Sequence, residues 1–169
     1  MRIIGDYYRQ DVIALSKDLL GKILVRRFDD GSELRAKITE VEAYRGEEDL
    51  ACHASKGRTK RTEVMYHQGG SLYVYLIYGM YWLLNIVSGE AGQPQAILIR
   101  GLENIKGPGR VGKALQLDKS FYGEDLNLSE RIWLERPTKL DQLSIKKSER
   151  IGVAYAGLEW ANKQWRFFI

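Results

Sequence analysis

Residues 72–87 read LYVYLIYGMYWLLNIV, and this stretch indicates the fold class of the chain. Its two apolar runs, 73–77 and 82–87, are rich in aromatic and β-branched residues and are separated by Tyr78-Gly79-Met80-Tyr81. Such runs on either side of a glycine-containing break predict two strands joined as a β-hairpin. The sequence therefore predicts at least one antiparallel pair of strands.

A second hairpin is predicted nearer the start of the chain. The segments 22–28 and 34–42 flank Asp29-Asp30-Gly31, which is a turn signal. Because hairpins recur, we expect an antiparallel sheet with a few helices packed against it. Further short strands are expected at 96–100, 132–134, 151–153 and 165–168.

Two helices are expected to pack against this sheet. Asp11 can cap a helix over 12–20, which Gly21 would end. A second helix, over 109–117, would be entered through Gly107-Pro108. The sequence shows no repeat, low-complexity tract or linker, so we expect a single α+β domain over residues 1–169.

The composition is that of a globular protein with a mild basic bias. The 169 residues are 44% hydrophobic, and 26 Lys and Arg against 22 Asp and Glu give a net charge of +4. This charge permits a nucleic-acid partner without requiring one. The single cysteine, Cys52, excludes an intramolecular disulfide. With two histidines and no ligand-spacing motif, we expect no metal and no other cofactor.

No segment has the character of a signal peptide or of a membrane span. The first residues lack an apolar core, and the apolar stretch around 72–87 is interrupted by Tyr78-Gly79 and by Asn85. We therefore expect a cytoplasmic protein that has no membrane partner. We also expect it to be a monomer.

Strand alternation draws attention to Glu42. Leu34, Ala36, Ile38, Glu40 and Glu42 share one face if their strand is regular, so that its apolar face would end in two carboxylates. A carboxylate in such a position is costly to bury unless it is paired or used, and it is a candidate general base. The alternative is that the strand ends earlier and both acids are solvated, and the pattern alone favours this alternative.

His53 and the segment 56–62 are weaker signals. His53 could donate or accept a hydrogen bond in a pocket, although a lone histidine is more often structural. Its neighbour Cys52 is not expected to form a catalytic dyad with it, because adjacent side chains on an extended segment point in opposite directions. The loop Lys56-Gly57-Arg58-Thr59-Lys60-Arg61-Thr62 combines positive charge with hydroxyls, which suits phosphate contacts, but an ordinary solvated loop fits equally well.

Tyrosines are concentrated in the segment 66–81, which holds five of the ten in the chain. Tyr73 and Tyr75 share a strand face, where aromatic residues usually belong to the core. Tyr78 lies at the expected hairpin tip, where there is little core to fill, and a planar side chain there could wedge between base pairs. Asn85 interrupts an apolar strand, so it either satisfies a buried group or contacts a ligand.

Read in order, these segments resemble the alkyladenine (3-methyladenine) DNA glycosylase family, and the resemblance covers nearly the whole chain. Its most specific part is Glu42-Ala43-Tyr44, followed by His53 and then by Tyr73-Val74-Tyr75-Leu76-Ile77-Tyr78-Gly79-Met80. The other matching segments are Asp18-Leu19-Leu20-Gly21, Arg58-Thr59-Lys60-Arg61, Leu84-Asn85, Leu98-Ile99-Arg100, Gly107-Pro108-Gly109-Arg110, Ala114-Leu115 and Arg150-Ile151-Gly152-Val153.

The resemblance implies a compact domain with a curved antiparallel sheet and a protruding β-hairpin, and it implies roles for individual residues. Glu42 matches the carboxylate that activates water. Tyr78, with Met80 beside it, matches the wedge that fills the gap left by a flipped nucleotide. The residues that match the base pocket are Tyr44, His53, Tyr75, Asn85 and Arg100. Asn85 would crowd the 2-amino group of guanine, and Arg100 would support the pocket. The candidate contacts to the DNA backbone are Arg58, Arg61 and Arg110.

The same resemblance implies a monofunctional glycosylase that acts on double-stranded DNA, at the nucleoid if the source is bacterial. It would flip 3-methyladenine or 7-methylguanine, with hypoxanthine and ethenoadenine as further candidates, and hydrolyse the glycosidic bond to leave an abasic site. No lysine is implied as a nucleophile, so strand cleavage is not expected. Neutral lesions would need an acid to assist the leaving group, so their pH dependence is expected to differ from that of cationic lesions.

Two positions of the sequence depart from the family pattern. Thr62 stands where the family usually has Asn, which bears on the phosphate contacts assigned to the basic loop, and Gln164 stands where it usually has Pro.

Two other classes of protein remain as alternatives to a DNA glycosylase. They are a non-catalytic nucleic-acid-binding module and an acid–base enzyme that acts on small nucleosides.

Overall fold

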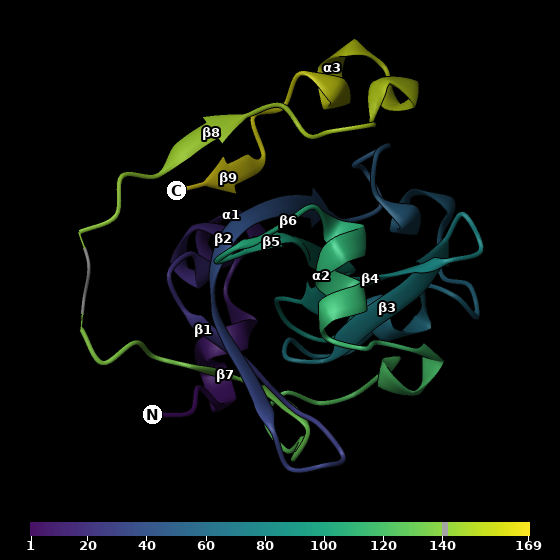
Figure 1. Ribbon diagram of the computed structural model, residues 1–169. Helices are drawn as coiled ribbons and strands as arrows, with labels where there is room; N and C mark the ends of the chain where they lie inside the picture. The colour runs from purple at the N-terminus through teal and green to yellow at the C-terminus, as the bar shows by residue number, and fades with distance from the viewer. Residues whose placement is uncertain (140–141) are drawn as a thin grey trace.

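Nine strands form one antiparallel sheet in residues 1–139 and 142–169, the part of the chain that the computed structural model describes (Figure 1). The main strand order is β3-β4-β5-β2-β1-β7, with β6 beside β5 and with β9 between β2 and β8. The strands are β1 (Ile23–Arg27), β2 (Glu33–Arg45), β3 (Leu72–Ile77), β4 (Tyr81–Val87), β5 (Gln95–Leu102), β6 (Ile105–Lys106), β7 (Ile132–Glu135), β8 (Lys146–Ser148) and β9 (Arg166–Phe168). The α-helices are α1 (Val12–Leu19), α2 (Pro108–Ala114) and α3 (Leu158–Ala161), and short 3-10 helices cover Gly5–Arg9, His53–Lys56, Glu63–Tyr66, Lys119–Phe121 and Ala154–Ala156.

This architecture confirms the predicted α+β class. Both predicted hairpins are present, because β1 pairs with β2 and β3 pairs with β4. The helix predicted over 12–20 is α1, and the Asp11 side chain accepts hydrogen bonds from two backbone N–H groups of its first turn. The helix predicted over 109–117 is shorter and begins one residue earlier, as α2, with Pro108 in its first turn.

Strand β2 is the longest element, and it pairs along both edges. One edge pairs with β5, and the other pairs first with β1 and then with β9. Its register against β5 shifts between Ile38 and Glu40 and again between Glu40 and Val41, which marks a β-bulge. Ala36 and Ile38 are buried in the core before this bulge, whereas Val41 and Ala43 are buried there after it. Even-numbered residues of β2 therefore point into the core before the bulge and away from it afterwards.

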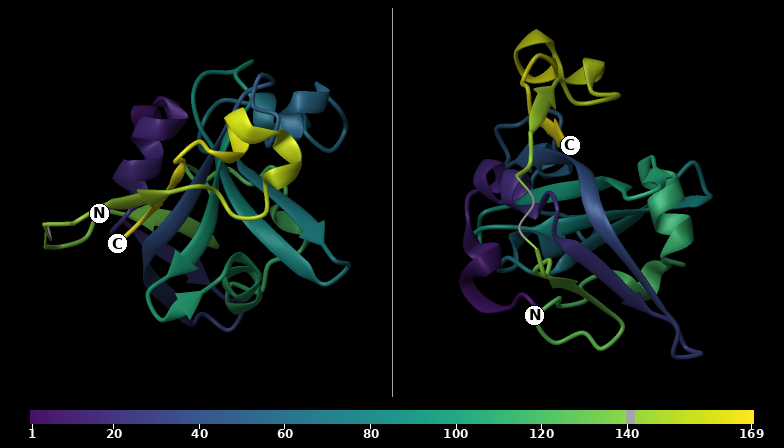
Figure 2. Two further views of the ribbon diagram at one scale, coloured as in Figure 1. Left: turned by 90° about the horizontal axis from the view of Figure 1, so that it is seen from above. Right: turned by 60° about the vertical axis from the view of Figure 1, so that its left-hand side comes forward.

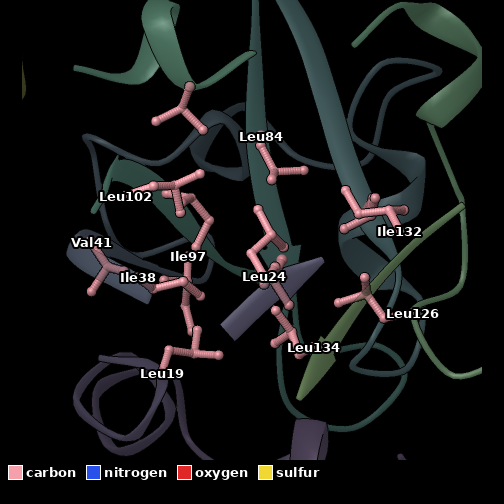
Figure 3. Packing of buried hydrophobic residues seen from close by; sticks show 14 of the residues in the cluster. Leu19, Leu24, Ile38, Val41, Leu84, Ile97, Leu102, Leu126, Ile132 and Leu134 are labelled. Atoms are coloured by element: carbon pink, nitrogen blue, oxygen red, sulfur yellow. The ribbon is translucent and has the colours of Figure 1, made fainter. Parts of the chain in front are cut away.

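The main hydrophobic core gathers side chains from α1 and from one face of the sheet strands (Figure 3). Leu19 of α1 lies beside Ile38 of β2 and Ile97 of β5, and Val111 of α2 belongs to the same cluster. Because alternate residues of a strand point to opposite faces, the other face of β2, β3, β4 and β5 remains available to line a pocket.

The C-terminal segment corrects one strand prediction. Residues 151–153 form a turn, and the strand in this region is β8 (Lys146–Ser148), which pairs with β9. The turn is apolar because Val153 is buried against Ala51 and Ala156. Figures 1 and 2 show β8, α3 and β9, in yellow-green to yellow, lying over one end of the sheet. The other three short strands predicted correspond to parts of β5, β7 and β9.

Gly112 brings α2 into direct contact with β4. A Cβ atom at this position would lie 1.8 Å from the carbonyl oxygen of Trp82, so a side chain fits only if the helix moves. We expect Gly112→Ala to lower the free energy of unfolding by about 3 kcal/mol, as measured by chemical denaturation. The control is Lys113→Ala at an exposed position of the same helix, which should change stability by less than about 0.5 kcal/mol. Equal losses in the two variants would contradict the close packing of α2.

Candidate active site

The strand faces that point away from the core enclose a pocket of about 640 Å³. Alternate residues of the sheet line it, including Tyr73 and Tyr75 on β3, Asn85 on β4 and Arg100 on β5. Other elements complete the lining, which also includes Glu42, Tyr44, Ala51, Cys52, His53, Arg61, Tyr78, Arg110, Ile151 and Tyr155. The pocket therefore brings together residues that are far apart in the chain, such as Glu42 and Tyr155.

Glu42 is a fully buried acid of this pocket, with an exposed fraction of 0%. Its Oε1 atom accepts a hydrogen bond from the Tyr44 hydroxyl at 2.8 Å, and its Oε2 atom accepts one from the backbone N–H of Ile151 at 2.6 Å. The Arg100 guanidinium lies 3.6 Å from Oε1. Both carboxylate oxygens are held, so the side chain has a fixed orientation.

The sequence predicted Glu42 on the apolar face of its strand together with Glu40, and this prediction is wrong. The bulge reverses the alternation of β2, so Val41 and Ala43 take the core face and Glu42 points into the pocket. The alternative, in which the strand ends earlier and both acids are solvated, is also wrong, because β2 continues to Arg45 and Glu42 is buried.

Glu40 lies outside the pocket lining and has a different set of partners. Its Oε1 atom is 3.1 Å from Nε of Arg100 and 2.7 Å from Nε of Arg166. Arg100 thus lies beside two carboxylates, with its shorter contact to Glu40. Glu40 therefore positions Arg100, and Arg100 supplies positive charge next to Glu42.

The electrostatic environment of Glu42 is balanced between burial and favourable contacts. Burial raises the pKa of Glu42, because the ionised form loses its hydration. Arg100, the Ile151 N–H and the Tyr44 hydroxyl oppose this shift by stabilising the charged form. Burial also holds the pKa of Tyr44 well above its usual value, so Tyr44 remains a hydrogen-bond donor to Glu42. A carboxylate with increased proton affinity is suited to act as a general base.

A buried ion pair between Arg150 and Asp49 holds in place the backbone N–H of Ile151 that bonds to Glu42. Arg150 donates two hydrogen bonds to Asp49, at 2.6 and 3.0 Å, and neither side chain has exposed surface. The Arg150 guanidinium also lies 4.9 Å from the centre of the Tyr44 ring. Because Ile151 directly follows Arg150, the ion pair fixes the backbone N–H that bonds to Glu42.

An uncharged aromatic cluster forms another side of the pocket. His53 Nδ1 lies 2.8 Å from the Tyr73 hydroxyl, and the His53 and Tyr75 ring centres are 4.7 Å apart. Burial, together with the charges of Arg61 and Lys56, lowers the pKa of His53 to about 4, so the imidazole is neutral at physiological pH. Burial raises the pKa of Tyr75 to about 12. This side of the pocket can therefore offer stacking surfaces and hydrogen bonds without a titrating charge.

Asn85 satisfies a buried group, which is one of the two alternatives that the sequence left open. Its exposed fraction is 4%, and its amide nitrogen donates to the carbonyl oxygen of Tyr73 at 3.1 Å. Asn85 also belongs to the pocket lining. The hydrogen bond fixes an amide at the pocket surface, where its remaining polar atoms can face a ligand.

The tip of the β3–β4 hairpin is exposed and has an unusual backbone. Tyr78 and Met80 are 84% and 64% exposed, and Figure 2 shows the hairpin extending beyond the rest of the sheet. Tyr78 has a φ of 53° and Gly79 a φ of 65°. A non-glycine residue in this left-handed region is uncommon and is often associated with function. Since Tyr78 also lines the pocket, the tip and the pocket are adjacent.

The three arginines predicted to contact the DNA backbone lie in different environments. Arg58 is paired with Glu63 through two hydrogen bonds of 2.6 and 2.7 Å. Arg61 lies against the Tyr75 ring, with its guanidinium carbon 5.1 Å from the ring centre. Arg110 is exposed on α2 and lines the pocket on another side. Arg61 and Arg110 therefore line the pocket, whereas Arg58 does not.

Thr62 and Gln164, which depart from the family pattern, have different structural roles. Thr62 is buried, and its hydroxyl accepts a hydrogen bond from the Thr59 N–H at 2.9 Å and donates to the Gly57 carbonyl at 3.1 Å. It therefore holds the basic loop in shape from inside. Gln164 is exposed just before β9.

Sequence reasoning assigned no role to several residues of the site. Asp49 is the last residue of an acidic run, 47–49, that carries no motif, and Arg150 and Ile151 occur only as part of a matching segment. Tyr155 was not singled out, yet it lines the pocket, and its hydroxyl donates to the Ala51 carbonyl at 3.0 Å. The pairing of Arg-Ile-Gly-Val with Glu42 links positions 109 residues apart, so no local pattern could reveal it.

The described part of the chain also bears on metal binding and on membranes. Among those residues, no group of three or more His, Cys, Asp or Glu side chains could hold a metal ion. None of the helices described is long and apolar enough to cross a membrane. Cys52 is buried, and burial raises its pKa to about 12, so its thiol stays protonated.

The chain is similar to known DNA glycosylases over nearly its whole length. The family model described as "Methylpurine-DNA glycosylase (MPG)" matches residues 6–169. A protein of Legionella pneumophila (strain Paris) is 45% identical and aligns over 99% of this chain and 94% of its own. Proteins of Borreliella afzelii (strain PKo), 41% identical over 96% and 93%, and Natranaerobius thermophilus, 38% identical over 100% and 96%, are also similar. Each of the three bears the name "Putative 3-methyladenine DNA glycosylase".

The chain belongs to the methylpurine-DNA glycosylase family. Members of this family are monofunctional DNA glycosylases, which are DNA-repair hydrolases that act on N-glycosyl bonds. The resemblance inferred from the sequence is thus confirmed, and so is the class of enzyme.

The raised pKa of Glu42 predicts that this residue lowers stability at neutral pH. Because the folded chain binds the Glu42 proton more tightly than the unfolded chain, the associated stability is lost as pH rises through the folded-state pKa. Glu42→Gln is uncharged at every pH, so we expect it to raise the Tm at a pH of about 8. The gain should disappear below about 4.3, the ordinary pKa of glutamate.

The Tm of the unchanged protein and that of Glu42→Gln are measured by thermal unfolding at a series of pH values between these two limits. The matched control is Glu130→Gln, which removes an exposed carboxylate and should leave the pH dependence of the Tm unchanged. A Tm of Glu42→Gln that falls below that of the unchanged protein at neutral pH would contradict the expectation.

Proposed function

We propose that this protein flips alkylated purines out of double-stranded DNA and hydrolyses their bond to the sugar, with Glu42 as the general base, to leave an abasic site. The expected lesions are 3-methyladenine and 7-methylguanine, and hypoxanthine and ethenoadenine are further candidates. The observation that carries the proposal is the buried, doubly hydrogen-bonded carboxylate of Glu42 in an aromatic pocket of about 640 Å³.

The reaction follows from the character of the substrate. A base inside the stack cannot be attacked, so it must be extruded, and extrusion is least costly for a damaged base. The bond between C1′ and the purine nitrogen breaks, and its electron pair leaves with the base. The sugar then resembles an oxocarbenium ion, to which water adds at C1′. Glu42 stabilises that positive charge and accepts the proton of the water.

The pocket walls match a planar purine. Tyr44 and Tyr75 offer ring faces to the base, and a cationic alkylpurine gains about 0.5–2 kcal/mol from an electron-rich ring. Asn85, fixed by its hydrogen bond to the backbone of Tyr73, would crowd the 2-amino group of a normal guanine. In this proposal His53 supplies a neutral hydrogen-bonding edge.

The hairpin tip and the arginines would bind the duplex. Tyr78 is suited to fill the gap left by the flipped nucleotide, with Met80 beside it, because both are exposed at the tip. Arg110 and the basic loop with Arg58 and Arg61 would contact phosphates, which fix position without reading sequence. Because Arg58 is paired with Glu63, its guanidinium would have to bind a phosphate either together with Glu63 or in place of it.

Single-turnover excision tests the proposal directly. Purified protein is mixed with labelled duplexes that carry 7-methylguanine or hypoxanthine, and release of the free base is followed beside Glu42→Gln. We expect the unchanged protein to release base and leave an intact abasic strand, and we expect Glu42→Gln to be slower by about 10²–10⁴-fold, the usual contribution of a general base. Glu130→Gln serves as the control and should keep full activity.

Two outcomes would count against the proposal. If the unchanged protein binds the duplexes but releases no base, the protein is a nucleic-acid-binding module and Glu42 is structural. If Glu42→Gln excises at the unchanged rate, the carboxylate is not the base. Retained DNA binding by Glu42→Gln separates a loss of chemistry from a loss of folding.

The hairpin wedge gives an independent prediction. Tyr78→Ala should excise hypoxanthine from a fully paired duplex at least about tenfold more slowly, because the unstacking of a base costs a few kcal/mol that the tyrosine offsets. The same variant should be affected less when the lesion lies in an unpaired bulge. An enzyme of small nucleosides would need no wedge, so Tyr78→Ala with full activity on duplex DNA would favour that alternative.

A further inference from the structure

Two of the aromatic pocket walls each lie against an arginine. The guanidinium carbon of Arg150 lies 4.9 Å from the ring centre of Tyr44, and that of Arg61 lies 5.1 Å from the ring centre of Tyr75. Arg150 has no exposed surface, and its charge is compensated by Asp49. In the described part of the chain Arg61 forms no ion pair with a carboxylate, so its charge acts on the pocket that it lines.

The backbone of the loop holds Arg61 at this place. The Tyr122 hydroxyl donates to the carbonyl oxygens of Lys60 and Arg61, at 3.2 and 2.8 Å. Thr62, the next residue, is buried and bonded to Gly57 and Thr59. Both sides of the loop are therefore anchored, and the Arg61 side chain is presented to the rim of the pocket beside Tyr75.

The electric field of Arg61 reaches the interior of the pocket. Its positive charge lowers the pKa of His53 and opposes the rise that burial causes in the pKa values of Tyr73 and Tyr75. His53 and Tyr75 are among the side chains that would surround a flipped base. A negative charge that develops on that base would therefore be stabilised by Arg61.

Neutral and cationic lesions differ in whether such a charge develops. When the C1′–N9 bond of a cationic 7-methylguanine breaks, the electron pair neutralises the departing base. When the same bond of a neutral hypoxanthine breaks, the base departs with a negative charge, and a proton from water completes the product. Only the neutral lesion therefore needs stabilisation of its leaving group.

Neither His53 nor Tyr75 is an acid of suitable strength to protonate the departing base at neutral pH. The pKa of His53 is about 4, so its imidazole is deprotonated at neutral pH, and the pKa of Tyr75 is about 12, so its hydroxyl is a weak proton donor. A permanent positive charge beside the base would act without a proton transfer.

We propose that Arg61 is a specificity-determining residue that stabilises the departing base of neutral purine lesions. This inference rests on the proposed function, since it needs the flipped base to lie against Tyr75. It concerns the uncharged purines that the proposed function already gives as further candidates, and it gives Arg61 a role beyond that of a phosphate contact.

The test compares two lesions under single-turnover conditions with saturating enzyme. Duplexes carrying hypoxanthine or 7-methylguanine are used at a mildly acidic pH that keeps 7-methylguanine cationic. We expect Arg61→Gln to slow hypoxanthine excision by about tenfold or more, as the loss of one electrostatic stabiliser usually does, and to change 7-methylguanine excision by less than about twofold. Arg61→Lys keeps the charge and should retain most of the hypoxanthine rate.

Arg58→Gln is the matched control, because it removes an arginine of the same loop that is paired with Glu63 and does not line the pocket. It should leave the ratio of the two rates unchanged. Thermal unfolding shows that each variant is folded, and a doubled enzyme concentration confirms saturation.

Two results would overturn the inference, and a third would overturn the proposed function. Equal losses on both lesions in Arg61→Gln would make Arg61 a contact to the DNA backbone and would overturn the inference. Excision of 7-methylguanine but not of hypoxanthine by the unchanged protein would overturn it as well. If the unchanged protein excises neither lesion, the proposed function itself fails, which is a distinct outcome.

Discussion

The buried ion pair between Asp49 and Arg150 is the interaction on which the site depends. Asp49 also accepts hydrogen bonds from the backbone N–H groups of Arg45 and Ala51, and Arg150 donates to the carbonyls of Ala43 and Trp160. These contacts satisfy both terminal nitrogens of the Arg150 guanidinium, whereas its buried Nε atom has no hydrogen-bond partner among the described residues. Removing one member of a buried ion pair costs about 3–5 kcal/mol. This network joins the end of β2, the segment before His53 and the C-terminal segment, so all three must be in place together.

The ion pair also explains how a carboxylate can be kept inside the protein. Glu42 is buried, and its ionisation is opposed by the loss of hydration. Arg100 and the Ile151 N–H oppose that penalty, and both are fixed by other residues: Arg100 by Glu40, and Ile151 by the preceding Arg150. The structure therefore holds the proposed general base in place through contacts within the protein. Burial still raises the pKa of Glu42, so its ionised form lowers the free energy of unfolding. Such a loss of stability is common at groups that serve a function.

Local patterns predicted the elements, whereas the arrangement of the site required contacts between distant residues. The hairpins and α1 follow from alternation, turn residues and the Asp11 cap, all of which act over a few positions. The face of Glu42 could not be read from alternation, because the bulge between Ile38 and Val41 adds a residue that only the partner strand reveals. Residues 151–153 likewise looked like a strand, since the sequence does not say that Val153 is apolar in order to cover Ala51. Resemblance to a family supplied the role of Glu42 that the pattern alone did not favour.

The rigid and exposed parts of the molecule are divided in a way that suits an enzyme acting on a large substrate. The carboxylate and its supports are buried, and their geometry is determined by several partners each. Tyr78, in contrast, is 84% exposed and has a φ of 53°, so neither burial nor local preference accounts for its position. A conformation of this kind costs of order 1–3 kcal/mol and persists only where the surroundings impose it. Here the pairing of β3 with β4 imposes it, and the result is an aromatic ring held out beside the pocket mouth. Because Tyr78 is exposed, its ring gains further contacts only when a partner surface binds there, which fits the duplex-opening role proposed for it beside the buried Glu42 carboxylate.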